Sequence, residues 1–221
     1  MFVKKTLKKK SFLVIGLGRF GSSFARNMMK MDCEVVAVDE DFEKVSKISE
    51  DVTEAMAGNI HDEDFLESLG LAHFDAVVVA IGHDIESSVL ITTLLKELGA
   101  KYVVSKAADD LHEKILQKIG ADWVVTVERE MGRKVALSLY SNKVIDSLEL
   151  TPDFRFVELV VLESWLGKQV AEIEVFKKHD LMLAAIKRGK EIITNPDKSL
   201  IFQKEDLVVV CGQTSKIMQL A

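Results

Sequence analysis

The chain has 221 residues, of which 48% are hydrophobic and 29% are charged, and these proportions predict a soluble globular protein of one large or two small domains. Its formal net charge of −6 argues against a general nucleic-acid partner, and no apolar run approaches the roughly 18–20 residues of a membrane-spanning helix. Cys33 and Cys211 belong to no CxxC or CxxH pattern, so we expect neither a disulfide framework nor a zinc site, and a reducing cytoplasm is the favoured compartment.

The first ten residues form a basic tail with five lysines, Lys4, Lys5, Lys8, Lys9 and Lys10. Two interpretations stay open for it. The tail is either a solvated segment before the first strand, or a segment attracted to an anionic lipid surface or an acidic partner. No apolar segment of the signal-peptide type follows the lysines, so we expect no secretory signal.

Residues 11–21, SFLVIGLGRFG, have the pattern of a buried strand, a glycine turn and the start of a helix. In such a turn Gly16 can adopt a positive φ, Gly18 lets the backbone approach a pyrophosphate, and Gly21 lets the helix pack closely on the strand. The N-terminus of the helix offers free N–H groups and a partial positive charge to the phosphates. The pattern therefore predicts a dinucleotide-binding turn.

A second strand, residues 34–39, ends in an acidic residue, Asp39, which lies 18 residues after Gly21. This separation is close to the roughly 20 residues at which such an acid accepts hydrogen bonds from an adenosine ribose. The order strand, GxGxxG, helix, strand and acid predicts a nucleotide-binding Rossmann half. The alternative is a glycine turn that serves packing alone.

Strands and helices continue to alternate up to residue 127. We expect helices at residues 42–49, 62–69, 85–98 and 109–119, and strands at residues 52–57, 75–81, 101–105 and 123–127. Because each parallel return needs a crossover, this order predicts an α/β fold with a doubly wound parallel sheet, in which ligands bind at the carboxyl ends of the strands. The residues at those ends are 16–21, Asp39, Gly58, Asn59, Ala80, Ile81, Gly82, Lys106 and Glu128.

The pattern changes near residue 140. After a helical stretch at residues 131–139, we expect strands at residues 146–150, 154–162, 181–187, 191–194 and 207–211, a short helix at 170–175 and a hairpin turn at 188–190. This is a small, mostly antiparallel α+β domain, which we expect to pack against a copy of itself. The expected organisation is a tail (1–10), a nucleotide-binding domain (11–127), a crossover helix and linker (128–143) and a C-terminal domain (144–221).

Five stretches carry a family resemblance: VIGLGRFG (14–21), VVAVDED (35–41), VVVAIG (77–82), KIGADWVVTVEREMG (118–132) and KEDLVVVCG (204–212). With them the chain resembles the RCK, or KTN (TrkA-type), cytoplasmic gating subunits of bacterial Ktr and Trk potassium uptake systems. The first stretch would also suit many dehydrogenases, whereas residues 118–132 are much more specific.

The resemblance implies an N-terminal Rossmann domain that binds ATP or ADP, with NAD or NADH as alternatives, a crossover helix and a small RCK C-terminal domain. It also implies dimers of N-terminal domains assembled into an octameric ring at the cytoplasmic face of the membrane. The nucleotide state would set the opening of a potassium-translocating membrane subunit. The chain itself would not be an enzyme.

The same resemblance implies a set of nucleotide-binding residues: Gly16, Gly18, Arg19, Phe20, Gly21, Asp39, Glu40, Gly58, Asn59, Ala80, Ile81, Gly82, Lys106 and His112. Arg19 would meet the terminal phosphate, Asp39 would hold the ribose, and Glu128 would contact a divalent cation such as Mg²⁺ or Ca²⁺ near a neighbouring subunit's nucleotide. From the residues alone, plainer roles stay open. Arg19 and His112 could be surface residues, and Glu128 could serve only to stabilise a helix N-terminus.

Some relatives bind cyclic di-AMP between two C-terminal domains, and residues 171–179 correspond to that region. Phe176 stands where the relatives known for this ligand tend to carry Arg, which weakens phosphate recognition.

An NAD-dependent oxidoreductase is the alternative function. Hydride transfer needs an acid or base beside the nicotinamide. The two tyrosines, Tyr102 and Tyr140, are in no YxxxK arrangement, and the second domain is small for a substrate cleft. A DNA regulator is disfavoured by the acidic charge and by the lack of a helix-turn-helix pattern. The other four histidines, His61, His73, His83 and His179, receive no role.

Overall fold

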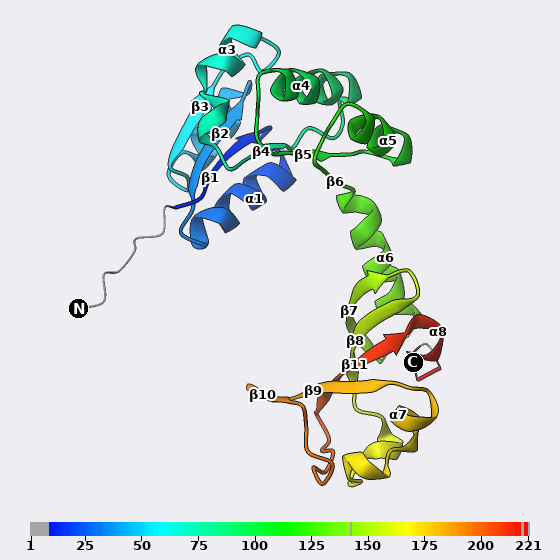
Figure 1. Cartoon of the computed structure of the whole chain (residues 1–221). Helices are drawn as coiled ribbons and strands as arrows, with labels where there is room; N and C mark the ends of the chain where they lie inside the picture. The colour runs from blue at the N-terminus through cyan, green and yellow to red at the C-terminus, as the bar shows by residue number, and fades with distance from the viewer. Residues whose placement is uncertain (1–8, 142, 218, 221) are drawn as a thin grey trace, which may run out of the picture. The chain divides into compact units, whose positions relative to one another are not determined.

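The computed structural model describes residues 9–141, 143–217 and 219–220, and the chain divides into two compact units between Glu128 and Arg129 (Figure 1). Among the helices of these residues, none is both long and apolar enough to cross a membrane.

The N-terminal unit contains a six-stranded parallel sheet of order β3-β2-β1-β4-β5-β6. Its strands are β1 (Ser11–Ile15), β2 (Glu34–Asp39), β3 (Glu54–Ala57), β4 (Ala76–Val79), β5 (Val103–Lys106) and β6 (Trp123–Val125). Its helices are α1 (Arg19–Lys30), α2 (Phe42–Ile48), α3 (Glu63–Ser68), α4 (Ile85–Glu97) and α5 (Asp110–Lys118), with a short 3₁₀ turn η1 (Leu71–His73). The strand order reverses at β1, which pairs with both β2 and β4, and ligands of such sheets bind at this switch point. The expected fold class is confirmed.

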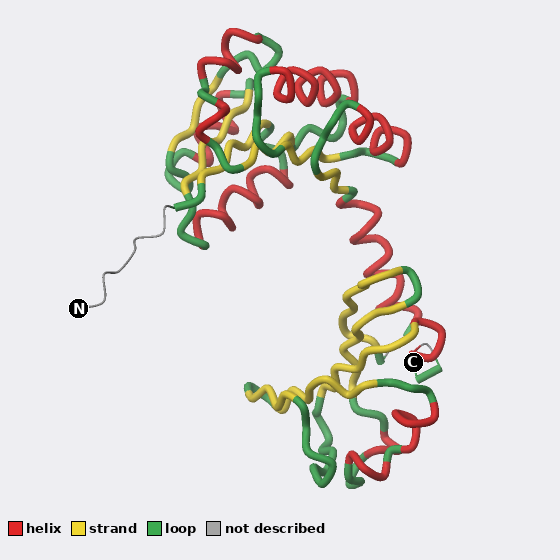
Figure 2. Tube along the Cα trace, in the orientation of Figure 1, coloured by secondary structure: helices red, strands yellow, loops and turns green. Residues whose placement is uncertain are grey.

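Helices cover both faces of this sheet (Figures 1 and 2). Val14 and Ala37 pack on one face with residues of α1 and α2. Leu13, Ile15 and Val77 pack on the other face with residues of α3 and α4. Successive residues of β1 therefore point to opposite layers, and β4 is buried along its whole length, as a sheet covered on both sides requires.

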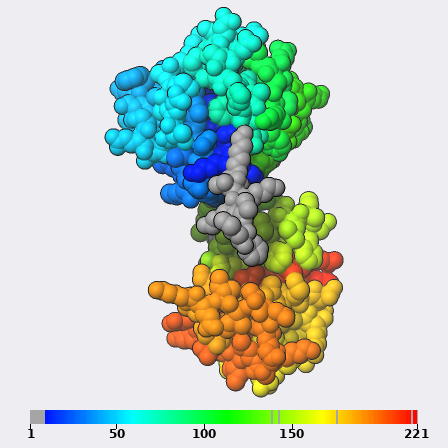
Figure 3. Space-filling view, turned by 60° about the vertical axis from the view of Figure 1, so that its left-hand side comes forward, coloured from blue at the N-terminus to red at the C-terminus, as the bar shows by residue number. Residues whose placement is uncertain are grey.

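The C-terminal unit contains an antiparallel sheet of order β10-β9-β11-β8-β7. Its strands are β7 (Val144–Thr151), β8 (Phe154–Val160), β9 (Met182–Arg188), β10 (Glu191–Thr194) and β11 (Leu207–Gln213). Its other elements are η2 (Glu163–Trp165), η3 (Val170–Glu172), α7 (Glu174–Lys178) and α8 (Thr214–Ile217), and α6 (Val127–Tyr140) contains the boundary between the two units. The β9–β10 hairpin turns at Gly189, which has a φ of +61°, and it projects from the surface of this unit (Figure 3).

Three expectations about the elements need correction. The strand expected up to residue 127 ends at Val125, because Val127 already belongs to α6, which also starts earlier than the expected helix. The helix expected at residues 170–175 is split into η3 and α7, since Ile173 is extended (φ −86°, ψ 91°) and its side chain is buried in the C-terminal core. The short helices η1, η2 and α8 have too few residues for a periodic pattern and were not expected.

Candidate functional site

The glycine turn after β1 is held by the strands on either side of it. Gly16 has a φ of +95°, as predicted, and its N–H donates to the Val38 carbonyl oxygen at 2.8 Å. The next N–H, of Leu17, donates to Asp39 Oδ2 at 2.6 Å. A Cβ at Gly16 would lie only 3.0 Å from Ile81 Cγ1. The turn is therefore fixed against the ends of β2 and β4.

The other two glycines of the motif have opposite surroundings. A Cβ at Gly21 would overlap the Gly16 carbonyl oxygen and lie 3.0 Å from Ala80 Cβ, so α1 packs on the turn more closely than a larger residue allows. At Gly18 a Cβ would meet no atom within 4 Å, and this residue is exposed. Gly21 thus serves packing, and Gly18 leaves open space above the turn where a phosphate could approach the backbone.

The first turn of α1 differs from the first turns of the four helices α2 to α5. Each of those helices is capped by an aspartate that accepts a hydrogen bond from a backbone N–H. The capping residues are Asp41, Asp62, Asp84 and Asp109. α1 follows Gly18 instead and has neither a side-chain cap nor an acid in its first turn, so its first N–H groups keep their partial positive charge for another acceptor. Arg19 is exposed at this point, while Phe20 is half-buried with its ring 6.4 Å from that of Phe24.

Asp39, the last residue of β2, is 6% exposed, and its carboxylate makes several hydrogen bonds. Besides the bond from Leu17, Oδ1 accepts from the Asp41 N–H at 2.9 Å. Lys44 Nζ lies 3.2 Å from Oδ1 and 3.3 Å from Oδ2. Lys44 has no role in the sequence-based prediction, although its position in the first turn of the helix that follows Asp39 is a signal that could have indicated this contact.

Glu40 follows β2 and contacts His61, which has no role in the sequence-based prediction. His61 Nδ1 lies 3.1 Å from Glu40 Oε1, and His61 Nε2 lies 2.7 Å from Ser87 Oγ. Ser87 Oγ also donates to Asp84 Oδ2 at 2.5 Å. The hydrogen bond from Ser87 lowers the pKa of Asp84. His61 is 21 and 26 residues from its two partners, so sequence spacing held no signal for this cluster.

The ends of β3 and β4 add Gly58, Asn59 and Gly82 to the same edge of the sheet. Asn59 is exposed, and a Cβ at Gly58 would overlap the ring of Phe65, which packs directly on the backbone there. A Cβ at Gly82 would lie 3.1 Å from Cδ, Cε and Nζ of Lys106. Gly82 therefore leaves the room that the lysine side chain occupies at the end of β5.

Lys106 pairs with Glu128, at the start of α6. Lys106 Nζ lies 2.7 Å from Glu128 Oε1; the lysine side chain is 11% exposed and that of the glutamate 61%. The hydrogen bond from Lys106 holds the pKa of Glu128 below its ordinary value. Among the described residues, no group of three or more His, Cys, Asp or Glu side chains is placed to hold a metal ion.

His112 is 1% exposed, so the alternative of a surface histidine is wrong. It lies on α5 one turn before Leu116, and both side chains are buried on the same face of the helix. The Ala108 N–H donates to His112 Nδ1 at 3.1 Å, which places the ring proton on Nε2, and burial lowers the pKa of the imidazole. Within the described part of the chain, Nε2 is buried without a hydrogen-bond partner.

Residues 12–127 match the TrkA-N domain, and residues 156–221 match the TrkA-C domain. The chain belongs to the TrkA-type (RCK) family of potassium uptake proteins. It is 41% identical over 209 residues to Ktr system potassium uptake protein C of Bacillus subtilis (strain 168), covering 95% of each chain. It is 37% identical over 211 residues to Ktr system potassium uptake protein A of the same organism, covering 96% of this chain and 95% of the other.

A solved structure with a similar fold is the GsuK channel bound to NAD, with a TM-score of 0.68 and 16% identity. The match covers 97% of the TrkA-type chain and 39% of the GsuK chain, so the chain spans less than half of that channel chain. At 16% identity the match supports the fold alone.

The TrkA-type chain uses Phe176 as a packing residue of its C-terminal unit. The ring of Phe176 meets that of Trp165 edge-on, with centroids 5.1 Å apart, and Trp165 is buried and packs in turn on Phe202. The aromatic contact accounts for a phenylalanine at this position.

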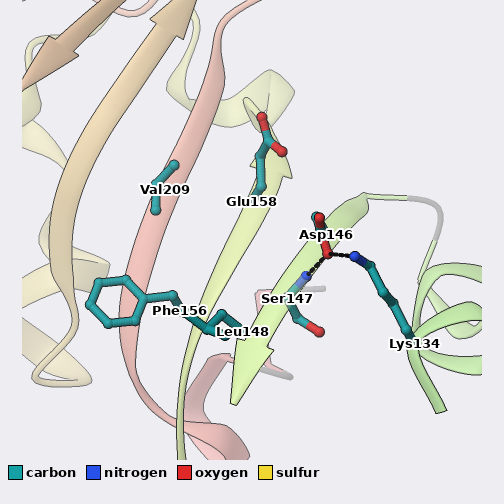
Figure 4. Close-up of a pocket in the computed structure, with 7 residues that line it drawn as sticks. All are labelled: Lys134, Asp146, Ser147, Leu148, Phe156, Glu158 and Val209. Carbon is teal, nitrogen blue, oxygen red and sulfur yellow. Dashed lines mark hydrogen bonds and ion pairs between the residues drawn. The ribbon is translucent and has the colours of Figure 1, made fainter. Parts of the chain in front are cut away.

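A shallow cavity of about 310 Å³ in the C-terminal unit of the TrkA-type chain lies on one face of β7, β8 and β11 (Figure 4). Its lining residues are Lys134, Asp146, Ser147, Leu148, Phe156, Glu158 and Val209. Lys134 Nζ lies 2.8 Å from Asp146 Oδ1, and this hydrogen bond lowers the pKa of Asp146. Glu158 pairs with Lys187 at 3.9 Å. Because these charges are paired, the cavity offers little to attract a charged ligand, and we assign it no role.

Proposed function

We propose that this TrkA-type chain is a nucleotide-sensing subunit of a potassium uptake system, not an enzyme, and that it couples the bound nucleotide to the opening of a membrane partner. The observation that carries the proposal is the α1 N-terminus. Its N–H groups have no side-chain cap, the backbone at Gly18 is open, and Arg19 is exposed beside it. These features fit the phosphates of ATP or ADP.

Arg19 is the residue we assign to the third phosphate. It stands at the first position of α1, where a guanidinium can donate to a terminal phosphate oxygen. The extra negative charge of ATP strengthens that contact relative to ADP. A ligand shifts a conformational equilibrium only through such a difference in affinity, and typical couplings are about 1–3 kcal/mol.

The adenosine would lie along the strand ends, where Asp39 would hold the ribose. Glu40, Gly58, Asn59, Ala80, Ile81, Gly82, Lys106 and His112 are the further residues that we assign to the site. The Nε2–H of His112 is buried and has no acceptor among the described residues, so His112 would reach a ligand only if the residues that cover it move.

Glu128 is our candidate for a divalent cation such as Mg²⁺ or Ca²⁺. Its carboxylate is largely exposed, although Oε1 is engaged by Lys106. One carboxylate provides too few oxygens for either ion, so phosphate oxygens, including those of a neighbouring subunit's nucleotide, would complete the shell. The cation and Lys106 would compete for the same carboxylate.

An oligomer is supported by an apolar stripe on α6. Met131, Val135 and Leu139 recur every four residues and are 55%, 49% and 76% exposed. A stripe of this kind is typical of a helix that packs against another chain. We propose dimers of N-terminal domains that assemble into an octameric ring beneath a potassium-translocating membrane subunit, on the cytoplasmic side. The curated names of the Ktr relatives support the potassium-uptake role.

Calorimetric titration with ATP, ADP, NAD⁺ and NADH tests the ligand assignment. We expect ATP and ADP to bind with different affinities and to change the assembly. Preference for NADH, together with substrate turnover, would favour the NAD-dependent oxidoreductase and refute the proposal. Size-exclusion mass measurements with and without ATP test the assembly, and a strict monomer in both conditions would contradict the ring.

A further inference from the structure

The carboxylate of Asp39 has all of its hydrogen-bonding positions occupied. An ionised carboxylate has about four lone-pair positions, two on each oxygen. Oδ1 accepts from the Asp41 N–H and from Lys44 Nζ, and Oδ2 accepts from the Leu17 N–H and from the same Nζ. A ribose hydroxyl can therefore donate to this carboxylate only after one of the present donors has left.

Of these donors, Lys44 is the one that can leave at low cost. The Leu17 N–H belongs to the glycine turn, and the Asp41 N–H lies at the N-cap of α2, so both are fixed by the backbone. The Lys44 side chain is 44% exposed, whereas that of Asp39 is 9% exposed. Water can solvate the displaced ammonium group, and Asp41 Oδ2, 3.9 Å away, offers a second partner.

We propose that Lys44 is a specificity-determining residue of the nucleotide site, because it occupies the positions on Asp39 that the ribose hydroxyls take when an adenosine nucleotide binds. This inference rests on the proposed function. When the nucleotide binds, the hydrogen bond from Lys44 to the Asp39 carboxylate is replaced by one from a ribose hydroxyl. The 2′-hydroxyl therefore adds little to the affinity of the wild-type chain, and it adds more once the competing lysine is removed.

The competition is tested by the dissociation constant of 2′-deoxy-ADP divided by that of ADP. The two ligands carry the same phosphates, so a change in charge near the site affects both equally and cancels in the ratio. The variant is Lys44→Met, which keeps the length of the aliphatic chain. The matched control is Lys47→Met on the same helix. The Lys47 side chain is 73% exposed and pairs only loosely with Glu43, at 3.7 Å.

For the wild-type chain and for Lys47→Met, we expect 2′-deoxy-ADP to bind within about threefold of ADP. For Lys44→Met, we expect the ratio to rise by about fivefold or more, since a hydrogen bond to a charged acceptor is then gained without a competitor. An unchanged ratio in Lys44→Met overturns the inference, as does an equal rise in Lys47→Met. A lower ratio in Lys44→Met would also overturn the inference, because it would show that Lys44 itself binds the ribose. A wild-type chain that binds neither ligand would instead refute the proposed function.

Discussion

The close packing of α1 on the glycine turn makes Gly21→Ala the sharpest test of the site's construction. The added Cβ would overlap the Gly16 carbonyl oxygen and press on Ala80. The turn cannot yield easily, because its N–H groups are bonded to the Val38 carbonyl and to the Asp39 carboxylate. The helix must therefore move away from the sheet.

Overpacking of this kind costs about 1–3 kcal/mol. The better helix propensity of alanine returns up to about 1 kcal/mol. Because the overlap is with a backbone atom, the upper end of that cost applies, and we expect a net loss of about 2–3 kcal/mol in the free energy of unfolding. We also expect weaker binding of ADP, because the N–H groups of α1 shift from their position over the turn. Urea unfolding followed by circular dichroism measures the first quantity, and calorimetry measures the second.

Gly132→Ala provides the control. Gly132 lies inside α6, and a Cβ there would meet no atom within 4 Å. The same substitution should stabilise the protein by about 0.5–1 kcal/mol at this position. If Gly21→Ala were as stable as Gly132→Ala and bound ADP like the wild-type chain, the argument from packing at the turn would be refuted.

Three other changes are predicted. Arg19→Ala should reduce the ratio of ATP to ADP affinity more than it reduces ADP binding, and equal losses in calorimetry would show that Arg19 does not contact the third phosphate. Because Lys106 lowers the pKa of Glu128 below its ordinary 4.5, their contact stabilises the fold above pH 4.5 and is lost as the pH falls through the lowered pKa. Lys106→Met should remove that contribution from the pH profile of unfolding. An identical profile would contradict this role of the ion pair. Asp206→Asn should destabilise the chain by about 2–4 kcal/mol in urea unfolding, since Asp206 is 1% exposed and accepts two 2.8 Å bonds from Arg188, and a loss below about 1 kcal/mol would refute this.

Much of the N-terminal fold could be predicted from the sequence because its signals are local. The apolar run at β4, the glycine turn and the spacing from Gly21 to Asp39 each reflect one strand or one turn, and the structure has the expected parallel sheet. Segment ends were less predictable. Val127 fits a strand by composition, yet it starts α6, because the partner strand β5 ends at Lys106 and leaves β6 without a pairing residue after Val125.

The candidate site was predicted less completely because its contacts join distant segments. The predicted parallel sheet already places the loops after β2, β3 and β4 at one edge, but it does not indicate that His61 contacts Glu40 and Ser87, which lie 21 and 26 residues away. His112 looked like a surface residue among polar neighbours, although its spacing from Leu116 already matched the buried face of α5. The contact of Lys44 with Asp39 decides how many acceptor positions of the Asp39 carboxylate are free for a ligand. This number depends on side-chain geometry, which the sequence does not give.

The uncapped first turn of α1 also bears on how long the protein survives in a cell. The N-termini of α2 to α5 are capped by aspartates of the chain, whereas the first N–H groups of α1 are available to water or to a ligand. A ligand that binds the folded chain alone lowers the population of opened molecules, by about a hundredfold at a concentration one hundred times its dissociation constant. Proteases cleave from that opened population. An empty chain would therefore be degraded faster than a filled one, and the abundance of the protein would follow the supply of its ligand.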